Sequence, residues 1–182
     1  ALEVGRRVRN LANSVTWGFS IAASTLVGQR LGRGEEAEAG AFGREIITLS
    51  LVVYVFVAAF VALFAEPIAG VFVDDPAAID LTTNFVIVAA VSVIPLGVGG
   101  SATGVLRGAG DTRIPFYASL IGLYGCALPA AYLGLVTPLA VAALYIALVV
   151  ETTVPAAISL WRFRTDRWKA ISRAYRPSAA DD

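Results

Sequence analysis

The sequence predicts an all-α protein, a polytopic bundle of about five membrane-spanning helices, and three observations support this. Hydrophobic residues make up 57% of the 182 residues. Charged residues make up only 15%, whereas a soluble domain carries about a quarter to wet its surface. Charges are absent from 10–29, 46–65 and 81–106, and Glu151 is the only one in 114–161. Because about 20 apolar helical residues cross a bilayer, each stretch can span it, and the last can span it twice.

The first two expected crossings differ in composition. The second, 46–64, is almost entirely Val, Leu, Phe and Ala, and this composition fits a lipid-facing helix. The first, 9–27, mixes hydroxyl residues with apolar ones, which is typical of a helix that faces other helices or a wet cavity. We therefore expect Ser20, Ser24 and Thr25 to line a substrate or ion pathway. The hydroxyl residues of the first crossing are Ser14, Thr16, Ser20, Ser24 and Thr25.

The remaining three crossings are expected at 81–106, 114–133 and 139–161. Gly134 and the pair Thr137–Pro138 separate the last two, because glycine and proline interrupt helices. Each of these crossings also contains a proline, which removes a backbone donor inside a helix and can produce either a static kink or a hinge. The prolines are Pro95, Pro129 and Pro155.

Small residues and a proline mark the third crossing as the best candidate for close packing and bending. Gly100, Gly104 and Gly108 are four residues apart, so they share one helical face and let another backbone approach. Pro95 is the best hinge candidate, because Gly97 and further glycines follow it closely.

Arginine and lysine occur in alternate loops, which predicts the orientation of the chain. The loops after the first and third crossings and the carboxy-terminal tail are basic, whereas the loops after the second and fourth crossings contain no lysine or arginine. We therefore expect a transmembrane part, 1–163, and a cytoplasmic tail, 164–182. Three arginines at the amino terminus would then lie outside, as a local exception: Arg6, Arg7 and Arg9.

Glu151 is the most informative single residue, because an ionisable group at membrane depth costs on the order of 3 kcal/mol and usually marks an ion or substrate path. The alternative is that Glu151 lies nearer the membrane surface and pairs with a loop arginine. The densest polar segment of the chain is 107–113. There we expect a turn at Gly110, a helix cap from Asp111 and an anchor to the headgroups from Arg107.

Several classes of function are disfavoured by composition. The net charge is zero, so no basic field favours nucleic acid. The chain has no histidine and one cysteine, Cys126, so neither a metal site nor an internal disulfide is expected. An isolated Glu151 is no catalytic constellation, and we expect neither an enzyme nor a cofactor. The sequence contains no methionine and starts at Ala1, so we expect a piece of a longer protein.

Three segments, taken together, resemble a known family. The run GFSIAASTLVGQRLG at 18–32 is similar to the end of the eighth helix in the multidrug and toxic compound extrusion (MATE) family. The segment 106–115 resembles the loop between helices ten and eleven of that family, and 162–169 resembles its usual ending. The resemblance implies helices eight to twelve of a twelve-helix, two-lobed exporter of the plasma membrane, whose amino-terminal lobe would be the partner of this one. Such exporters exchange H+ or Na+ for small amphipathic, often cationic, drugs and metabolites.

One departure from the family concerns ion coupling. One branch carries a coupling carboxylate midway along helix ten, whereas 92–96 contains no acid here. The coupling ion and the coupling residue are therefore not carried over. Two alternatives to the exporter stay open, a flippase for lipid-linked substrates and a structural membrane fragment. The flippase would need a cavity lined by arginine or lysine at membrane depth, and this chain has none there.

Overall fold

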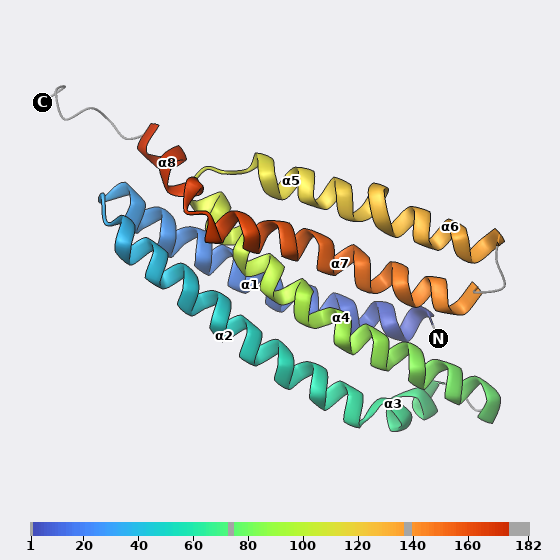
Figure 1. Cartoon of the computed structure of the whole chain (residues 1–182). Coiled ribbons are helices and arrows are strands. Elements are labelled where there is room, and N and C mark those ends of the chain that lie inside the picture. The colour runs from blue at the N-terminus through green and yellow to red at the C-terminus, as the bar shows by residue number, and fades with distance from the viewer. Residues whose placement is uncertain (1, 73–74, 137–139, 175–182) are drawn as a thin grey trace, which may run out of the picture.

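The structure is a computed structural model that describes the backbone of residues 2–72, 75–136 and 140–174, and the side chains of 13–72, 75, 78–136 and 142–174. This part of the chain is helical and contains no strand, which confirms the predicted all-α class. Long helices lie side by side, with short helices at the two ends of the bundle (Figure 1). The elements are α1 (Leu2–Gly32), α2 (Glu36–Leu63), α3 (Ala65–Phe72), α4 (Pro76–Gly108), α5 (Arg113–Leu120), η1 (Ile121–Ala127), α6 (Leu128–Val136), α7 (Ala140–Arg164) and α8 (Arg167–Ala174).

Within the described residues, four helical stretches are long and apolar enough to cross a membrane: Glu36–Leu63, Ala78–Gly108, Arg113–Val136 and Ala142–Arg164. The first expected crossing lies within α1, which has 31 residues but is not among these four. Its hydroxyl and amide side chains lower its hydropathy, in keeping with a helix that packs mainly on other helices.

Two details of the expected crossings differ in the structure. The second apolar stretch is only part of α2, which begins at Glu36, because charged residues can extend a helix beyond the hydrocarbon core. Gly134 does not break the fourth crossing. It is buried inside α6, which continues to Val136. The pair Thr137–Pro138 lies outside the described residues, as do the side chains of Arg6, Arg7 and Arg9.

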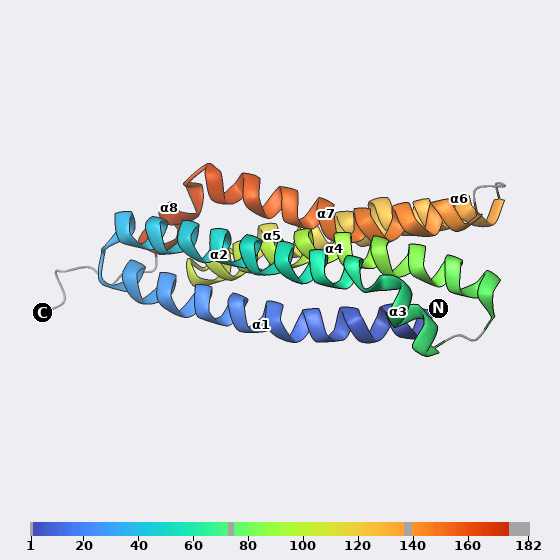
Figure 2. The same cartoon turned by 90° about the horizontal axis from the view of Figure 1, so that it is seen from below.

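Helix α4 is the centre of the bundle. It packs against α1, α2 and α7, and Figure 2 shows α1 and α7 on opposite sides of the bundle. In its most apolar window, 56% of the residues are buried, against 17% in α2. The exposed side chains of α2 include Val52, Phe56 and Leu63. They form the apolar outer face that lipid is expected to cover.

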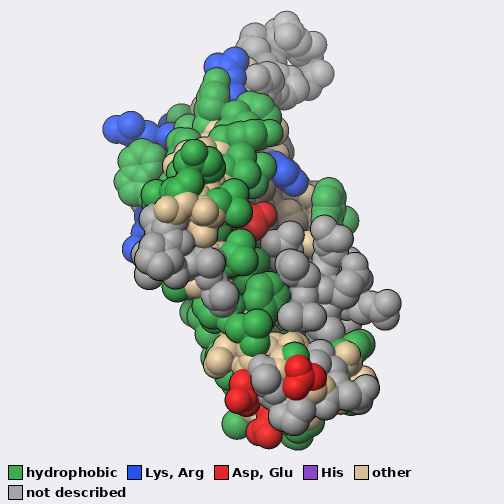
Figure 3. Space-filling model, turned by 90° about the vertical axis from the view of Figure 1, so that its right-hand side faces the viewer, with side chains coloured by type: hydrophobic (Ala, Val, Ile, Leu, Met, Phe, Trp, Pro, Cys, Tyr) green, Lys and Arg blue, Asp and Glu red, His purple; other side chains and the backbone are tan. Residues whose placement is uncertain are grey.

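The main core lies where α1, α4 and α7 end and α8 packs, and we call this end of the bundle the α8 end. Trp168 of α8 is fully buried there among apolar side chains of α1, α2 and α4. The opposite end, which we call the α3 end, holds α3 and the start of α4. Figure 3 views this end and shows acidic side chains gathered at one edge of it. Among the described residues, the exposed acids at this end are Glu66, Asp75 and Asp80.

Two helices stop at the α8 end through the same backbone motif. Gly34 follows α1 with φ of 84°, and Gly110 follows α4 with φ of 85°, a left-handed conformation that glycine adopts without steric cost. After α4, the N–H of Gly110 donates to Arg107 O at 2.9 Å and that of Asp111 to Leu106 O at 2.8 Å. This is the Schellman pattern, which satisfies the last carbonyls of a helix. The turn expected at Gly110 is therefore present.

The fourth crossing contains a π-helical segment, η1, between α5 and α6. The N–H of Leu128 donates to Leu123 O, five residues earlier, as a π-helix requires. Pro129 follows immediately and has no N–H to donate. The wider turn therefore precedes a residue that could not form the regular α-helical hydrogen bond in any case. Gly122 lies in this segment and is buried against α7.

Candidate functional site

A cavity of about 350 Å³, lined by both polar and apolar residues, lies between α1, α4, α7 and the helix formed by α5 and η1. It contains the one carboxylate that the sequence places at membrane depth, together with hydroxyl and amide groups from three other elements. The lining residues are Asn13, Thr16, Pro95, Leu96, Gly99, Gly100, Thr103, Ser119, Leu123, Glu151, Thr152, Pro155 and Ala156.

Glu151 reaches this cavity from the middle of α7, where it is partly buried. The neighbouring Thr152 is buried, and its hydroxyl donates to Val149 O at 3.0 Å within the same helix. Pro155 has no N–H, so it cannot donate the α-helical hydrogen bond to the Glu151 carbonyl oxygen. This oxygen lies on the side of α7 that faces Gly122 of η1. A Cβ at Gly122 would lie 2.6 Å from Pro155 Cγ, so glycine is needed for η1 to approach α7 this closely.

A hydrogen bond on the α1 side of the cavity joins two helices. The Thr16 and Tyr54 hydroxyl oxygens are 2.6 Å apart, and both side chains are buried. The Tyr54 ring packs directly over Gly97 of α4, and the Thr16 methyl group packs over Gly100. The Tyr54 side chain therefore touches α1 and α4 at one point, next to the cavity.

Two rows of small residues form the contact between α1 and α4, which run in the same direction. Thr16, Ser20 and Ser24 on α1 face Gly100, Gly104 and Gly108 on α4 in that order. A Cβ at Gly104 would lie 2.8 Å from Ser20 Cα, and one at Gly108 would lie 2.9 Å from Ser24 Cα. The backbones thus approach closely, as small residues spaced by four allow.

The expected pathway residues do not gather in the cavity. Ser20 and Ser24 lie at the α1–α4 contact, and the Ser24 hydroxyl donates to Ile21 O at 3.0 Å within its own helix. Thr25 is exposed on the outside of α1. Instead, α1 contributes Asn13 and Thr16 to the cavity that contains Glu151.

The loop between α4 and α5 is held by a buried ion pair. Asp111 is 3% exposed, and its carboxylate accepts a hydrogen bond from Arg162 Nε of α7 at 2.7 Å. Helix α5 begins after Thr112 without a side-chain cap, so the expectation that Asp111 caps this helix was wrong. The carboxylate pairs with Arg162 instead, because a buried carboxylate needs a charged or strongly donating partner. Arg107 is exposed nearby.

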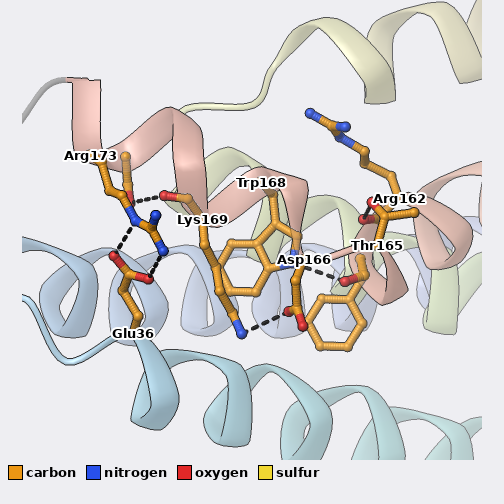
Figure 4. A network of polar contacts seen from close by, with 9 residues as sticks. Glu36, Arg162, Thr165, Asp166, Trp168, Lys169 and Arg173 are labelled. Carbon is orange, nitrogen blue, oxygen red and sulfur yellow. Dashed lines mark hydrogen bonds and ion pairs between the residues drawn. The ribbon is translucent and has the colours of Figure 1, made fainter.

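A second polar network attaches α8 to the bundle (Figure 4). Arg173 binds both carboxylate oxygens of Glu36, at 2.7 and 2.6 Å, and this hydrogen bonding raises the pKa of Arg173. Lys169 pairs with Asp166 at 2.7 Å. The Trp168 indole N–H donates to Phe163 O at 2.9 Å, and the two rings stack with centroids 5.7 Å apart. Helix α8 is thereby joined to the start of α2 and the end of α7.

Sequence reasoning missed Tyr54 and Arg162. Tyr54 is the only tyrosine in the stretch 46–64, and a phenol in such an apolar segment usually finds a buried hydrogen-bond partner. That signal was available. Arg162 could not be distinguished from the other tail arginines, because its partner lies 51 residues away. Among the described residues, no group of His, Cys, Asp and Glu could hold a metal ion.

Comparison with known proteins places the chain in a family. Residues 1–133 match the MatE family. The chain is 33% identical over 151 residues to the multidrug resistance protein MdtK of Cronobacter sakazakii, covering 80% of this chain and 33% of that protein. It is 32% identical over 168 residues to the probable multidrug resistance protein NorM of Rhodopseudomonas palustris, covering 90% and 35%. The chain thus spans about a third of the length of these curated relatives.

The fold also has a counterpart among solved structures. The eukaryotic MATE transporter AtDTX14 superposes on 96% of this chain with a TM-score of 0.86, and the chain covers 39% of that protein. The sequence identity of 23% makes this a likeness of fold. Because residues 1–133 match the family and the chain is more than 30% identical to MdtK and NorM, the chain belongs to the MatE family.

Proposed function

We propose that this chain forms the carboxy-terminal part of a secondary active antiporter that exports small amphipathic or cationic compounds. The observation that carries the proposal is the cavity that Glu151 lines together with Asn13, Thr16 and Ser119 from other helices. A carboxylate held at membrane depth beside neutral oxygen ligands can bind a proton or a sodium ion. The names of the relatives MdtK and NorM, which describe multidrug resistance, support the export of drugs.

The proposed role of Glu151 is to carry the coupling ion, H+ or Na+. A carboxylate that takes up a cation loses its net charge. The free energies of the occupied and empty states then differ, and this difference can bias a conformational equilibrium. Glu151 lies beside Pro155 of α7 and opposite η1, two places where the helices depart from regular α-helical hydrogen bonding. Ion binding at Glu151 would therefore change the conformational equilibrium at this point of the bundle.

Pro95 is the proposed hinge of α4. Helix α4 continues through Pro95, and Pro95 lines the Glu151 cavity. Gly97, Gly99 and Gly100 follow it, and they leave the backbone able to bend on this side. Movement about Pro95 would change the shape of the cavity and so couple ion binding to exposure of a substrate path. The loop motif around Arg107, Gly110 and Asp111 is proposed to keep the end of α4 attached to α7 during this movement.

The proposal extends to the whole transporter. An amino-terminal lobe of the same protein would complete the substrate path, and the assembly would lie in the plasma membrane with the carboxy terminus in the cytoplasm. A transporter working in this way needs no enzyme chemistry and no cofactor besides the coupling ion.

A transport assay with the complete transporter in sealed vesicles tests the proposal. Proton and sodium gradients are imposed separately, and the movement of a fluorescent cationic dye is followed for the native protein and for Glu151→Gln. We expect one gradient to drive dye movement and the substitution to abolish it. Glu66→Gln, which alters an exposed acid at the α3 end, serves as the matched control and should transport normally.

The outcomes of this assay separate the parts of the proposal. Dye movement that survives in folded Glu151→Gln would contradict the role of Glu151 and leave the exporter intact. No dye movement under either gradient would contradict the exporter itself and favour lipid-linked substrates.

A further inference from the structure

A second cavity, an apolar groove of about 410 Å³, runs between α2, α4 and α7. Apart from Thr153, every residue that lines it is apolar, and it includes Leu51 of α2, Val91 and Ile94 of α4, and Leu160 of α7. The groove and the Glu151 cavity lie on opposite sides of the contact between α4 and α7. Pro95 of α4 and Ala156 of α7 line both. Leu51 and Val91 are 43% and 51% exposed, so the groove opens on the surface of the bundle. Its chemistry suits a hydrocarbon chain.

Two exposed arginines lie beyond the groove toward the α8 end, in line with its walls. On α2, Arg44 precedes Leu51 by seven residues, and on α7, Arg164 follows Leu160 by four. Seven residues are about two helical turns and four are about one, so each arginine lies on the same helix face as its groove residue. Arg44 is about 10 Å along α2 from Leu51, and Arg164 is about 6 Å along α7 from Leu160. Neither arginine forms an ion pair with another residue of the described part of the chain.

A third cation joins them. A Cβ at Gly40 would lie 3.1 Å from Lys169 Nζ and 3.8 Å from Arg44 Nη1, so these two cationic groups converge on one point of α2. Asp166 neutralises Lys169 at 2.7 Å. The charges of Arg44 and Arg164 are left for a ligand from outside the described chain. Toward the α8 end the apolar groove is therefore followed by cations from three helices, Arg44 and Lys169, which converge at Gly40, and Arg164 at the end of α7; we call these three residues the basic cluster.

We propose that the groove and the basic cluster together bind one anionic phospholipid. One acyl chain lies in the groove between α2 and α7, and the phosphate binds Arg44 and Arg164 beside Lys169. Guanidinium groups bind phosphate through paired hydrogen bonds, and anionic headgroups are attracted to basic residues at the ends of membrane helices. Both arginines follow the apolar groove residues along their helices toward the α8 end, in the order in which a phosphate follows an acyl chain within one lipid molecule.

A lipid bound there would act on the helices that flank the Glu151 cavity. It would hold α2 and α7 at a set distance over Pro95, which lines both cavities. This inference concerns a resident lipid and does not depend on the proposed export activity.

Native mass spectrometry of the purified protein tests the proposal, with phosphatidylglycerol and phosphatidylcholine of matched acyl chains titrated separately. We expect phosphatidylglycerol to bind at least tenfold more tightly. The combined substitution Arg44→Gln and Arg164→Gln should lower phosphatidylglycerol affinity by about fivefold per arginine. Ala157→Phe, which fills the groove, should weaken the binding of both lipids. Ala157 is exposed in the groove wall, so neither variant disturbs the buried core.

The matched control is the combined substitution Arg33→Gln and Arg107→Gln, which removes two exposed arginines at the same end without touching the groove. It should leave phosphatidylglycerol affinity within twofold of the native value. Equal affinity for the two lipids, or an equal loss in the control, would overturn the proposal. An unchanged affinity in Ala157→Phe would overturn the placement of the acyl chain and leave only a surface attraction.

Discussion

At the scale of single residues, Tyr54 makes a contact that involves three helices. Its hydroxyl is hydrogen-bonded to Thr16 of α1, and its ring covers Gly97 of α4, while the side chain itself is 1% exposed. Many large apolar side chains of α2, among them Val52, Phe56 and Leu63, point outward. Tyr54 therefore favours the face of α2 that it shares with the buried Ser50 and Ala58 as the inward one, because its hydroxyl group must find a partner away from lipid.

We expect Tyr54→Phe to reduce stability by about 1 kcal/mol, because the ring contact is kept and a buried hydrogen bond is lost. Thermal unfolding in detergent, followed by tryptophan fluorescence, measures this. Tyr132→Phe removes an exposed hydroxyl and serves as the control, with no change expected. An unchanged melting temperature for Tyr54→Phe would show that the hydrogen bond contributes nothing.

The ion pair between Asp111 and Arg162 leads to a second prediction at this scale. Both partners are largely withdrawn from solvent, at 3% and 15% exposure. Asp111→Asn keeps the shape of the side chain and leaves the Arg162 charge without its counter-charge, so we expect a loss of about 1.5–3 kcal/mol. The same unfolding assay reports it.

The pair between Arg173 and Glu36 provides the comparison for Asp111→Asn. Arg173 is exposed, so its ion pair is screened by water and Arg173→Gln should change stability little. Equal effects of the two substitutions would contradict the buried character of the Asp111 pair.

At the scale of elements, the contact between α1 and α4 depends on small residues on both helices. Gly104 faces the backbone of Ser20, and an added Cβ would lie 3.0 Å from Ala23 Cβ as well. The contact atoms are backbone and a short side chain, so neither can rotate away. The distance between the two helices can increase only if the row of contacts from Gly100 to Gly108 is loosened.

Gly104→Ala is therefore expected to destabilise the bundle by about 1–3 kcal/mol, as overpacking does. The sign is the informative part, because alanine at an unconstrained helix position stabilises by up to about 1 kcal/mol relative to glycine. Gly18 of α1 has nothing within 4 Å of an added Cβ, so Gly18→Ala is the matched control and should be neutral or stabilising. Chemical unfolding in detergent distinguishes the two signs, and a stabilised Gly104→Ala would contradict the close packing.

At the scale of the whole molecule, charge differs between the two ends of the bundle. Among the side chains that the structure describes, the exposed arginines lie at the α8 end, and the exposed side chains of the α3 end include Glu66 and Asp80. Basic residues remain on the cytoplasmic side during insertion, so we predict that the α8 end is cytoplasmic.

Cysteine labelling of intact cells measures this orientation. Cys126 is the only cysteine of this chain, so the background for single introduced thiols is the complete transporter with Cys126 and any cysteine of its other part replaced by alanine. We expect Glu66→Cys to react with a membrane-impermeant maleimide and Arg167→Cys to react only after the cells are permeabilised. The reverse pattern would overturn the orientation, and with it the prediction of a cytoplasmic tail.

The sequence by itself determined the class of the protein and its family. Hydrophobic content and the length of each uncharged stretch are properties of the chain alone, and the bilayer imposes a fixed span, so the all-α membrane bundle could be predicted. The motifs at 18–32, 106–115 and 162–169 were local as well, and the match of residues 1–133 to the MatE family confirms the assignment made from them. The glycine row in α4 could be recognised from its spacing alone, because residues four apart share a helical face.

Only the tertiary structure decided which side chains meet. Thr16 and Tyr54 are 38 residues apart, and Asp111 and Arg162 are 51 apart, so no local pattern relates them. The same holds for Ser20 and Ser24, which lie against the α4 glycines, while their place on a pathway stays a prediction. A polar face on a helix indicates that this face is turned away from lipid. Whether that face meets a cavity or a neighbouring backbone depends on the rotation and separation of several helices at once, and those are determined by packing of the whole bundle.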